Sequence, residues 1–178
     1  MKKFLLLLVL SLVCISPSDS ATLSNCSEAF ISLPFGHTFA RTQKRMLNSG
    51  ARVLTPRKDS LTMEGFFESY PALYVFGFYK SNLLNSKSVY LQSMGNADYD
   101  RQFHEALQKG FNDTYGSTQQ TPSLNTRRTG KIVLRNIWTP DRYTTITMTY
   151  NPEASKRFPG SSLSDKFIQI TYKYSKWD

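Results

Sequence analysis

The sequence is poor in the side chains that build metal sites and covalent catalysts. Its 178 residues include two cysteines and two histidines, too few for a four-cysteine zinc site or a multi-disulfide scaffold. Glycine and proline are also sparse, with 9 and 8 residues, which excludes a collagenous or low-complexity chain. The nucleophile elbow, the paired-histidine zinc motif, the phosphate-binding loop and the dinucleotide fingerprint are all absent. We therefore expect no cofactor and no bound metal.

Long apolar runs are scarce, and the exception stands at the N-terminus. Lys2 and Lys3 precede a nearly unbroken apolar run from Phe4 to Ile15, and small and polar residues follow it. That run is too short to cross a hydrocarbon core of ~30 Å comfortably. It predicts a signal peptide over residues 1–20, cleaved after about Ser20. The mature protein is then secreted or periplasmic, with no transmembrane segment.

Cleavage at that position would remove Cys14 and leave Cys26 as the single thiol. In an oxidising compartment a lone thiol is buried and inert, paired with another chain, or functional. Cys26 lies close to the expected mature terminus, which favours exposure. The sequence leaves these three alternatives open.

Negative charge is in short supply, because 22 basic residues stand against 13 acidic ones and give a net charge of +9. The expected signal peptide holds two lysines and one aspartate, so the excess belongs to the mature chain. A basic surface favours an anionic partner such as an envelope or host polymer. Nucleic acid is a poor expectation for an exported protein. The composition, 40% hydrophobic and 13% aromatic, excludes wholesale disorder.

Two helices are expected, after an irregular lead-in over residues 21–36. The first begins at Thr38 as N-cap, continues to about Asn48 and stops at Gly50. The second begins at Asp98 as N-cap and ends at Gly116. Its aromatic and aliphatic residues recur every four positions, which is typical of an amphipathic helix packed on a core. Ser117–Thr129 is expected to form a surface loop.

Six strands are expected, three after each helix, because short runs of β-forming residues alternate with turn residues. The predicted strands are Leu61–Phe67, Ala72–Lys80, Ser88–Met94, Lys131–Trp138, Thr144–Tyr150 and Phe167–Tyr174. Strict alternation in the last two strands is typical of an antiparallel sheet with one wet face. The sequence thus predicts a single α+β domain over residues 21–178, with an antiparallel sheet covered on one face by two helices. A tandem α-β-β-β duplication, with halves 38–94 and 98–178, is one interpretation of that order.

Two classes of function remain. The first is a non-enzymatic binding protein of the inhibitor, immunity or adaptor type that recognises another protein or an anionic polymer. It would use either the wet face of the C-terminal sheet or the basic first helix. The candidate residues are Arg41, Lys44, Arg45, Arg127, Arg128, Thr147 and Lys173.

The second class is an envelope- or host-directed hydrolase. A thiolate nucleophile needs a basic partner within reach, and the chain offers only Cys26, His37 and His104 for these roles. This alternative requires the three side chains to meet near a carboxylate. We expect the binding protein rather than the enzyme.

Overall fold

The computed structural model describes residues 26–79, 82–118, 121–125, 131–152 and 166–177, so the predicted signal peptide lies outside the described residues. The two long helices are α2, Phe39–Asn48, and α3, Ala97–Tyr115. A helical segment, 26–31, precedes α2, and a short 3-10 helix, η2, covers Ser175–Trp177. The strands are β1 Arg52–Pro56, β2 Ser60–Phe67, β3 Tyr70–Phe78, β4 Leu84–Gln92, β5 Thr121–Asn125, β6 Lys131–Trp138, β7 Thr144–Tyr150 and β8 Lys166–Tyr174.

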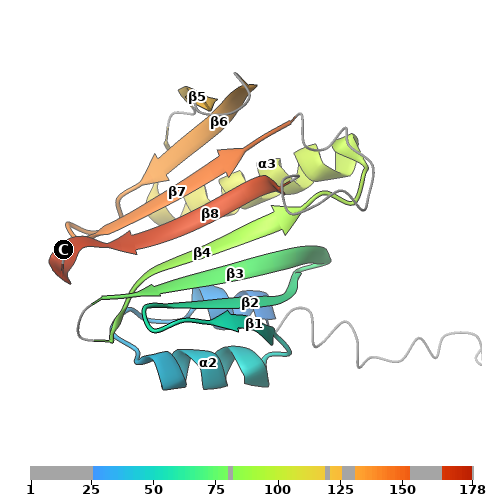
Figure 1. The fold of residues 1–178 in the computed structure, drawn as a ribbon. Coiled ribbons are helices and arrows are strands. Elements are labelled where there is room, and N and C mark those ends of the chain that lie inside the picture. The colour runs from blue at the N-terminus through green and yellow to red at the C-terminus, as the bar shows by residue number, and fades with distance from the viewer. Residues whose placement is uncertain (1–25, 80–81, 119–120, 126–130, 153–165, 178) are drawn as a thin grey trace, which may run out of the picture.

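The strands form one eight-stranded sheet in the order β1-β2-β3-β4-β8-β7-β6-β5, and every neighbouring pair is antiparallel. The predicted α+β class with an antiparallel sheet is confirmed. Strands β4 and β8 lie at the centre and join β1–β3 to β5–β7 (Figure 1). None of the helices that the structure describes is long and apolar enough to cross a membrane.

Both edge strands, β1 and β5, are additions to the six that the sequence predicts. The loop expected over Ser117–Thr129 is wrong where Thr121–Asn125 pairs with β6. The sequences of these edge strands contain proline and do not alternate between apolar and polar residues. Pairing with the neighbouring strand therefore fixes their position. The irregular lead-in is likewise wrong at residues 26–31, which are helical.

The start of α2 is as predicted and the start of α3 is not. The Thr38 hydroxyl accepts from Arg41 N at 3.5 Å. For α3 the N-cap is Asn96, whose Oδ1 accepts from the backbone N–H groups of Asp98 and Tyr99 at 3.2 and 3.1 Å. Asp98 therefore lies inside the first turn, where its charge favours the helix N-terminus.

One face of the sheet carries the core. Every second side chain of β3 from Tyr70 to Phe78 is buried, and the neighbouring strands bury their matching positions. The alternation of β7 and β8 predicts seven inward residues, of which Tyr174 is only half-buried and the other six are buried, namely Ile146, Met148, Tyr150, Ile168, Ile170 and Tyr172. Burial of this apolar face is the main driving force for the fold.

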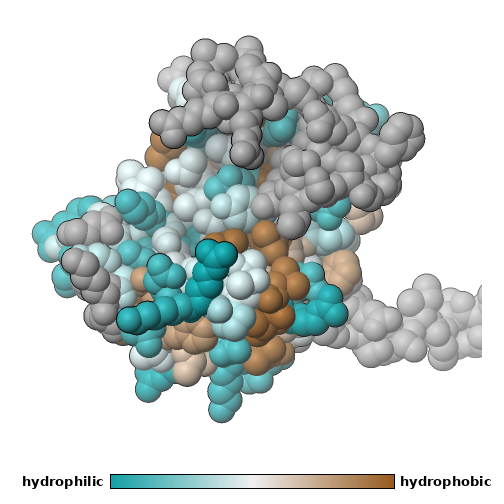
Figure 2. Space-filling view, viewed as in Figure 1, coloured by the Kyte–Doolittle hydropathy of each residue, from teal (hydrophilic) through white to brown (hydrophobic). Residues whose placement is uncertain are grey.

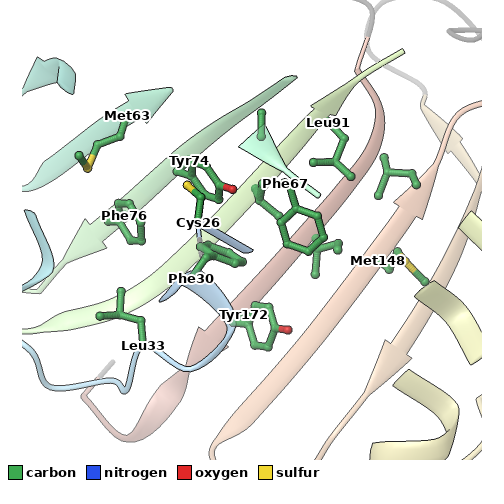
Figure 3. Close-up of a cluster of buried hydrophobic side chains, with 14 of the residues drawn as sticks. Cys26, Phe30, Leu33, Met63, Phe67, Tyr74, Phe76, Leu91, Met148 and Tyr172 are labelled. Carbon is green, nitrogen blue, oxygen red and sulfur yellow. The ribbon is translucent and has the colours of Figure 1, made fainter. Parts of the chain in front are cut away.

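Phe30 joins the helical segment 26–31 to this core. Its ring lies 5.3 Å from that of Tyr74 and 5.9 Å from that of Tyr172, between centroids. Figure 3 shows Phe30 among the buried rings of the strands. Later in the chain, the ring of Phe111 in α3 lies 6.3 Å from that of Tyr172 and 5.1 Å from that of Trp138, between centroids. Both helical elements therefore contact the face that carries Tyr172.

Candidate functional site: the open face of the sheet

The second face of the sheet, here called the open face, carries the side chains that alternate with the core residues. These side chains are partly exposed along β3, β4 and β7. Figure 1 is seen from this face, with α3 behind β7 and β8. The register places one continuous row across all eight strands. That row is Arg52, Glu64, Leu73, Tyr90, Gln169, Thr149, Arg135 and Thr121.

A hollow of about 650 Å³ lies on the open face at the β1–β4 end of that row. Its apolar wall consists of Leu54, Phe66, Pro71, Leu73 and Tyr90. Phe66 and Leu54 are each 44% exposed and line the same hollow, so they form a contiguous apolar patch rather than isolated exposed side chains. Figure 2 shows the apolar patch over this part of the sheet. The volume is within the range of small-molecule and side-chain pockets.

Arg52 and Glu64 form an ion pair at the side of the hollow. They face each other directly between β1 and β2, and both Nε and Nη2 of Arg52 donate to one carboxylate oxygen of Glu64. The Arg52 side chain is 78% exposed, so the pair contributes less than about 1 kcal/mol to stability. Its effect is to place one charge of each sign beside an apolar wall.

Hydroxyl groups dominate the centre of the open face. Ser88 and Thr171 share a hydrogen bond of 3.0 Å between β4 and β8, and Thr171 also accepts from Gln169 Nε2 at 3.0 Å. Thr147 faces Thr171 from β7, and Lys173 faces Thr145. The structure therefore brings two predicted contact residues, Thr147 and Lys173, onto the same face. Their alternation in the sequence was the signal that found them.

The predicted contacts of the first helix are exposed. Arg41, Lys44 and Arg45 all lie on the solvent side of α2, and none forms an ion pair with a carboxylate of the described chain. Arg45 Nη2 instead donates to Ser32 Oγ at 2.7 Å. Burial, and then the charges of Arg41 and Arg45, lower the pKa of His37 below its ordinary value. Arg127 and Arg128 lie outside the described residues.

Cys26 is buried, 2% exposed, and is a free thiol. A Cβ added at Gly65 would meet its Sγ at 3.2 Å, so the thiol fills the space that this glycine leaves. The expectation of an exposed thiol is therefore wrong, because the helical segment 26–31 packs this residue under the sheet. Figure 3 shows Cys26 beside Tyr74.

His104 has different neighbours from Cys26 and His37. Its ring stacks on Tyr150 at 4.2 Å between centroids, and burial lowers its pKa to about 4.

Asp100, one turn earlier on α3, is buried and accepts a hydrogen bond from Ser93. That carboxylate and burial raise the pKa of Tyr70 to about 12, with burial the larger cause. Among the described residues, no group of three metal-binding side chains gathers.

The hollow is the part of the site that sequence analysis missed. Phe66 alternates with the buried Leu61, Met63 and Phe67, and this period of two was the available signal. The pattern of one strand places Phe66 on the open face. It does not reveal that three further strands align apolar side chains beside it.

No family model matches this chain, and no match was found among curated proteins.

Proposed function

We propose that the protein is an exported, non-enzymatic binding protein that recognises another protein through the hollow on the open face. The observation that carries this proposal is the exposure of Phe66 and Leu54 in a preformed apolar hollow. Exposed apolar patches with polar surroundings are typical of interaction sites. An inhibitor, immunity or adaptor role is the type of function that we propose.

The chemistry of the hollow favours a protein segment with one apolar anchor side chain. Anchors of this kind fill well-packed pockets near the centre of an interface and supply most of the binding energy. Arg52 and Glu64 would meet polar groups at the rim and set the orientation of the partner.

Export is the second part of the proposal. It is supported by Lys2 and Lys3 before the apolar run from Phe4 to Ile15. Cleavage after about Ser20 gives a mature protein that begins at Ala21 and meets its partner in the periplasm or outside the cell. N-terminal sequencing of the protein recovered from that compartment tests this directly.

We also propose that the two halves of the chain arose by tandem duplication, with their helices on one face of the sheet. Each half has one long helix followed by four strands, and the strand order is symmetric about the β4–β8 pair. Phe39 of α2 packs 5.2 Å from the buried ring of Phe78, and Phe111 of α3 packs 6.3 Å from that of Tyr172, between centroids, which supports the common face. The unit would be α-β-β-β-β, one strand longer in each half than the sequence predicts.

The test is a comparative affinity capture from the protein's own compartment with three baits. These are the mature protein, a Phe66→Asp variant in the hollow and an Ile137→Asp variant. Ile137 is a matched control because it is an exposed apolar residue, 46% accessible, in β6. We expect a partner that the mature protein and the Ile137→Asp variant retain and that Phe66→Asp loses by at least ~10-fold, since a buried anchor contributes ≥2 kcal/mol.

The thermal transitions of the three baits must agree, which shows that each is folded. Equal capture by the folded Phe66→Asp variant would rule out the hollow as the binding site.

A further inference from the structure

A second surface feature lies at the end of the molecule that carries the C-terminus. Here the ring of Tyr143 has Arg142 Cζ 4.5 Å and Lys176 Nζ 5.7 Å from its centroid. These three residues are named the Tyr143 clamp. Figure 2 shows hydrophilic side chains gathered at this end, away from the apolar patch. An aromatic face attracts cations, so Tyr143 holds both positive groups close together.

The backbone of the clamp is fixed by two sets of hydrogen bonds. Asp141 Oδ1 accepts from the N–H groups of Tyr143 and Thr144 at 2.7 and 2.9 Å. These bonds hold the pKa of the Asp141 carboxyl below its ordinary value. On the other side, Ser175 N donates to Tyr143 O at 2.9 Å and ties η2 to the β6–β7 hairpin. Arg142 and Lys176 therefore project from anchored backbone, which lowers the entropy cost of binding.

Among the residues that the structure describes, positive charge exceeds negative charge around the clamp. Arg142 and Lys176 are exposed, and neither forms an ion pair with any carboxylate that the structure describes. Lys173, also exposed, adds a third cation on β8. Asp141 is the acidic residue of the hairpin, and it already accepts two backbone hydrogen bonds. The described residues of the clamp thus carry a net positive charge that can attract an anion.

Neutral hydrogen-bonding groups adjoin the cations. Lys173 faces Thr145 on one side and Ser86 on the other, in the registers of β7 and β4. The next row inward contains Ser88, Thr171 and Thr147. Hydroxyl groups donate and accept hydrogen bonds, so this strip complements a ligand that is itself rich in hydroxyls.

We propose that the Tyr143 clamp and the adjoining hydroxyl strip bind an acidic glycan, with its carboxylate or sulfate groups on Arg142, Lys173 and Lys176. A glycan combines the anionic and hydroxyl groups that these two neighbouring surfaces match. Single-stranded nucleic acid fits less well, because it stacks its bases on open aromatic faces. The ring of Tyr143 is approached by two cations, and Tyr174 stacks on Phe35 at 5.2 Å.

The experiment measures binding of the mature protein to four labelled probes by fluorescence anisotropy across a salt series. The probes are polygalacturonate, heparin, neutral dextran and a single-stranded oligonucleotide of comparable length. We expect binding to at least one of the two acidic glycans, weaker binding to the oligonucleotide and none to dextran. The affinity should fall as salt rises, because the contacts of Arg142, Lys173 and Lys176 are screened.

A double variant, Arg142→Gln with Lys176→Gln, tests the residues of the clamp. We expect it to weaken glycan binding about 5- to 30-fold, since an exposed charge contact contributes up to about 1 kcal/mol. The matched control is Arg101→Gln with Lys109→Gln on α3, which removes two exposed cations far along the sequence from the clamp. This control should change the affinity by less than about 2-fold.

Three results would overturn the proposal: wild-type affinity in the folded clamp variant, equal losses in the clamp and control variants, or preference for the oligonucleotide. The proposal is independent of the hollow, and Phe66→Asp should bind the glycan as the wild type does. Loss of protein capture by that variant with glycan binding intact would therefore support both sites separately.

Discussion

His104 shows how one buried side chain makes the fold sensitive to acid. Its ring is 4% exposed and stacks on Tyr150, and its Nε2 atom has no hydrogen-bond partner among the described residues. Placing a positive charge there would remove it from water without compensation. Burial therefore lowers the pKa from 6.5 to about 4, and the nearby charge of Glu105 only partly opposes the shift.

We predict that stability falls as the pH is lowered from about 6.5 to 4. In this interval the unfolded chain binds a proton at His104 and the folded protein does not, so acid favours the unfolded state. The lowered pKa of His104 corresponds to a loss of about 2–3 kcal/mol in the free energy of unfolding across this pH interval. Urea unfolding at several pH values measures it, and a His104→Phe variant should have a shallower dependence on pH.

A His37→Phe variant is the comparison for this prediction. The pKa of His37 is also lowered, but this residue is only half-buried. Replacing His37 should therefore change the pH dependence of the unfolding free energy less than replacing His104 does. An unchanged acid dependence in the folded His104→Phe variant would show that other groups, such as the acidic residues, are responsible.

At the scale of elements, Lys87 connects the helical segment 26–31 to β4. Its Nζ atom donates to the carbonyls of Phe30, Ile31 and Leu33 at 2.7, 2.8 and 2.7 Å. These carbonyls lie at the C-terminal end of the segment, where a helix leaves acceptors without internal partners. Burial, and then the charge of Arg45, lower the pKa of Lys87 to about 7. The rings of Phe30 and Tyr172 also face the amine.

We predict that Lys87→Met destabilises the protein by about 2–4 kcal/mol, because two buried carbonyls and one part-buried carbonyl lose their donor while the side-chain volume is retained. The effect should be local first, so amide hydrogen exchange over residues 26–33 should accelerate more than in the strands. Urea unfolding measures the total loss in the free energy of unfolding. Lys109→Met, at an exposed position of α3, should remain within about 0.5 kcal/mol of wild type. An unchanged free energy of unfolding in the Lys87→Met variant would show that the lysine does not hold the segment 26–31 in place.

The elements that could be predicted are those whose own side chains carry the pattern. Helix α3 and strands β7 and β8 alternate or repeat clearly, and the structure confirms them. Strands β1 and β5 and the segment 26–31 depend on partners distant in the sequence, namely β2, β6 and Lys87. Local pattern does not contain that information.

The same reasoning divides the candidate site. Thr147 and Lys173 share the open face because alternation within β7 and β8 requires it. The hollow depends on the register of four strands, and the Tyr143 clamp on the contact between the β6–β7 hairpin and η2. Both are tertiary features, so no short motif indicated them.

At the scale of the whole molecule, the β4–β8 pair determines whether the chain is one domain or two. Seven residue pairs align between these strands, and Val89 faces Ile170 within the core. Tyr172 of β8 also contacts Phe30 of the segment 26–31, which packs on the strands of the first half, and Phe111 of the second half. Because a continuous sheet and a shared ring connect the halves, neither half has a complete core without the other.

We therefore predict a single cooperative unfolding transition, observed with one probe in each half. Trp138 fluorescence, in a Trp177→Phe background, reports on the second half. Pulsed labelling of the Cys26 thiol, which is buried beside Gly65 of β2, reports on the first half. The two urea midpoints should coincide, as two-state behaviour requires. Ile170→Ala at the junction should lower the free energy of unfolding by about 2–4 kcal/mol, since it truncates a core side chain that is 1% exposed. Both urea midpoints should therefore fall together. The control Ile137→Ala, at an exposed position, should move neither midpoint appreciably. Separate midpoints, or a shift confined to one probe, would mean that residues 38–94 and 98–178 fold as two domains joined at β4 and β8.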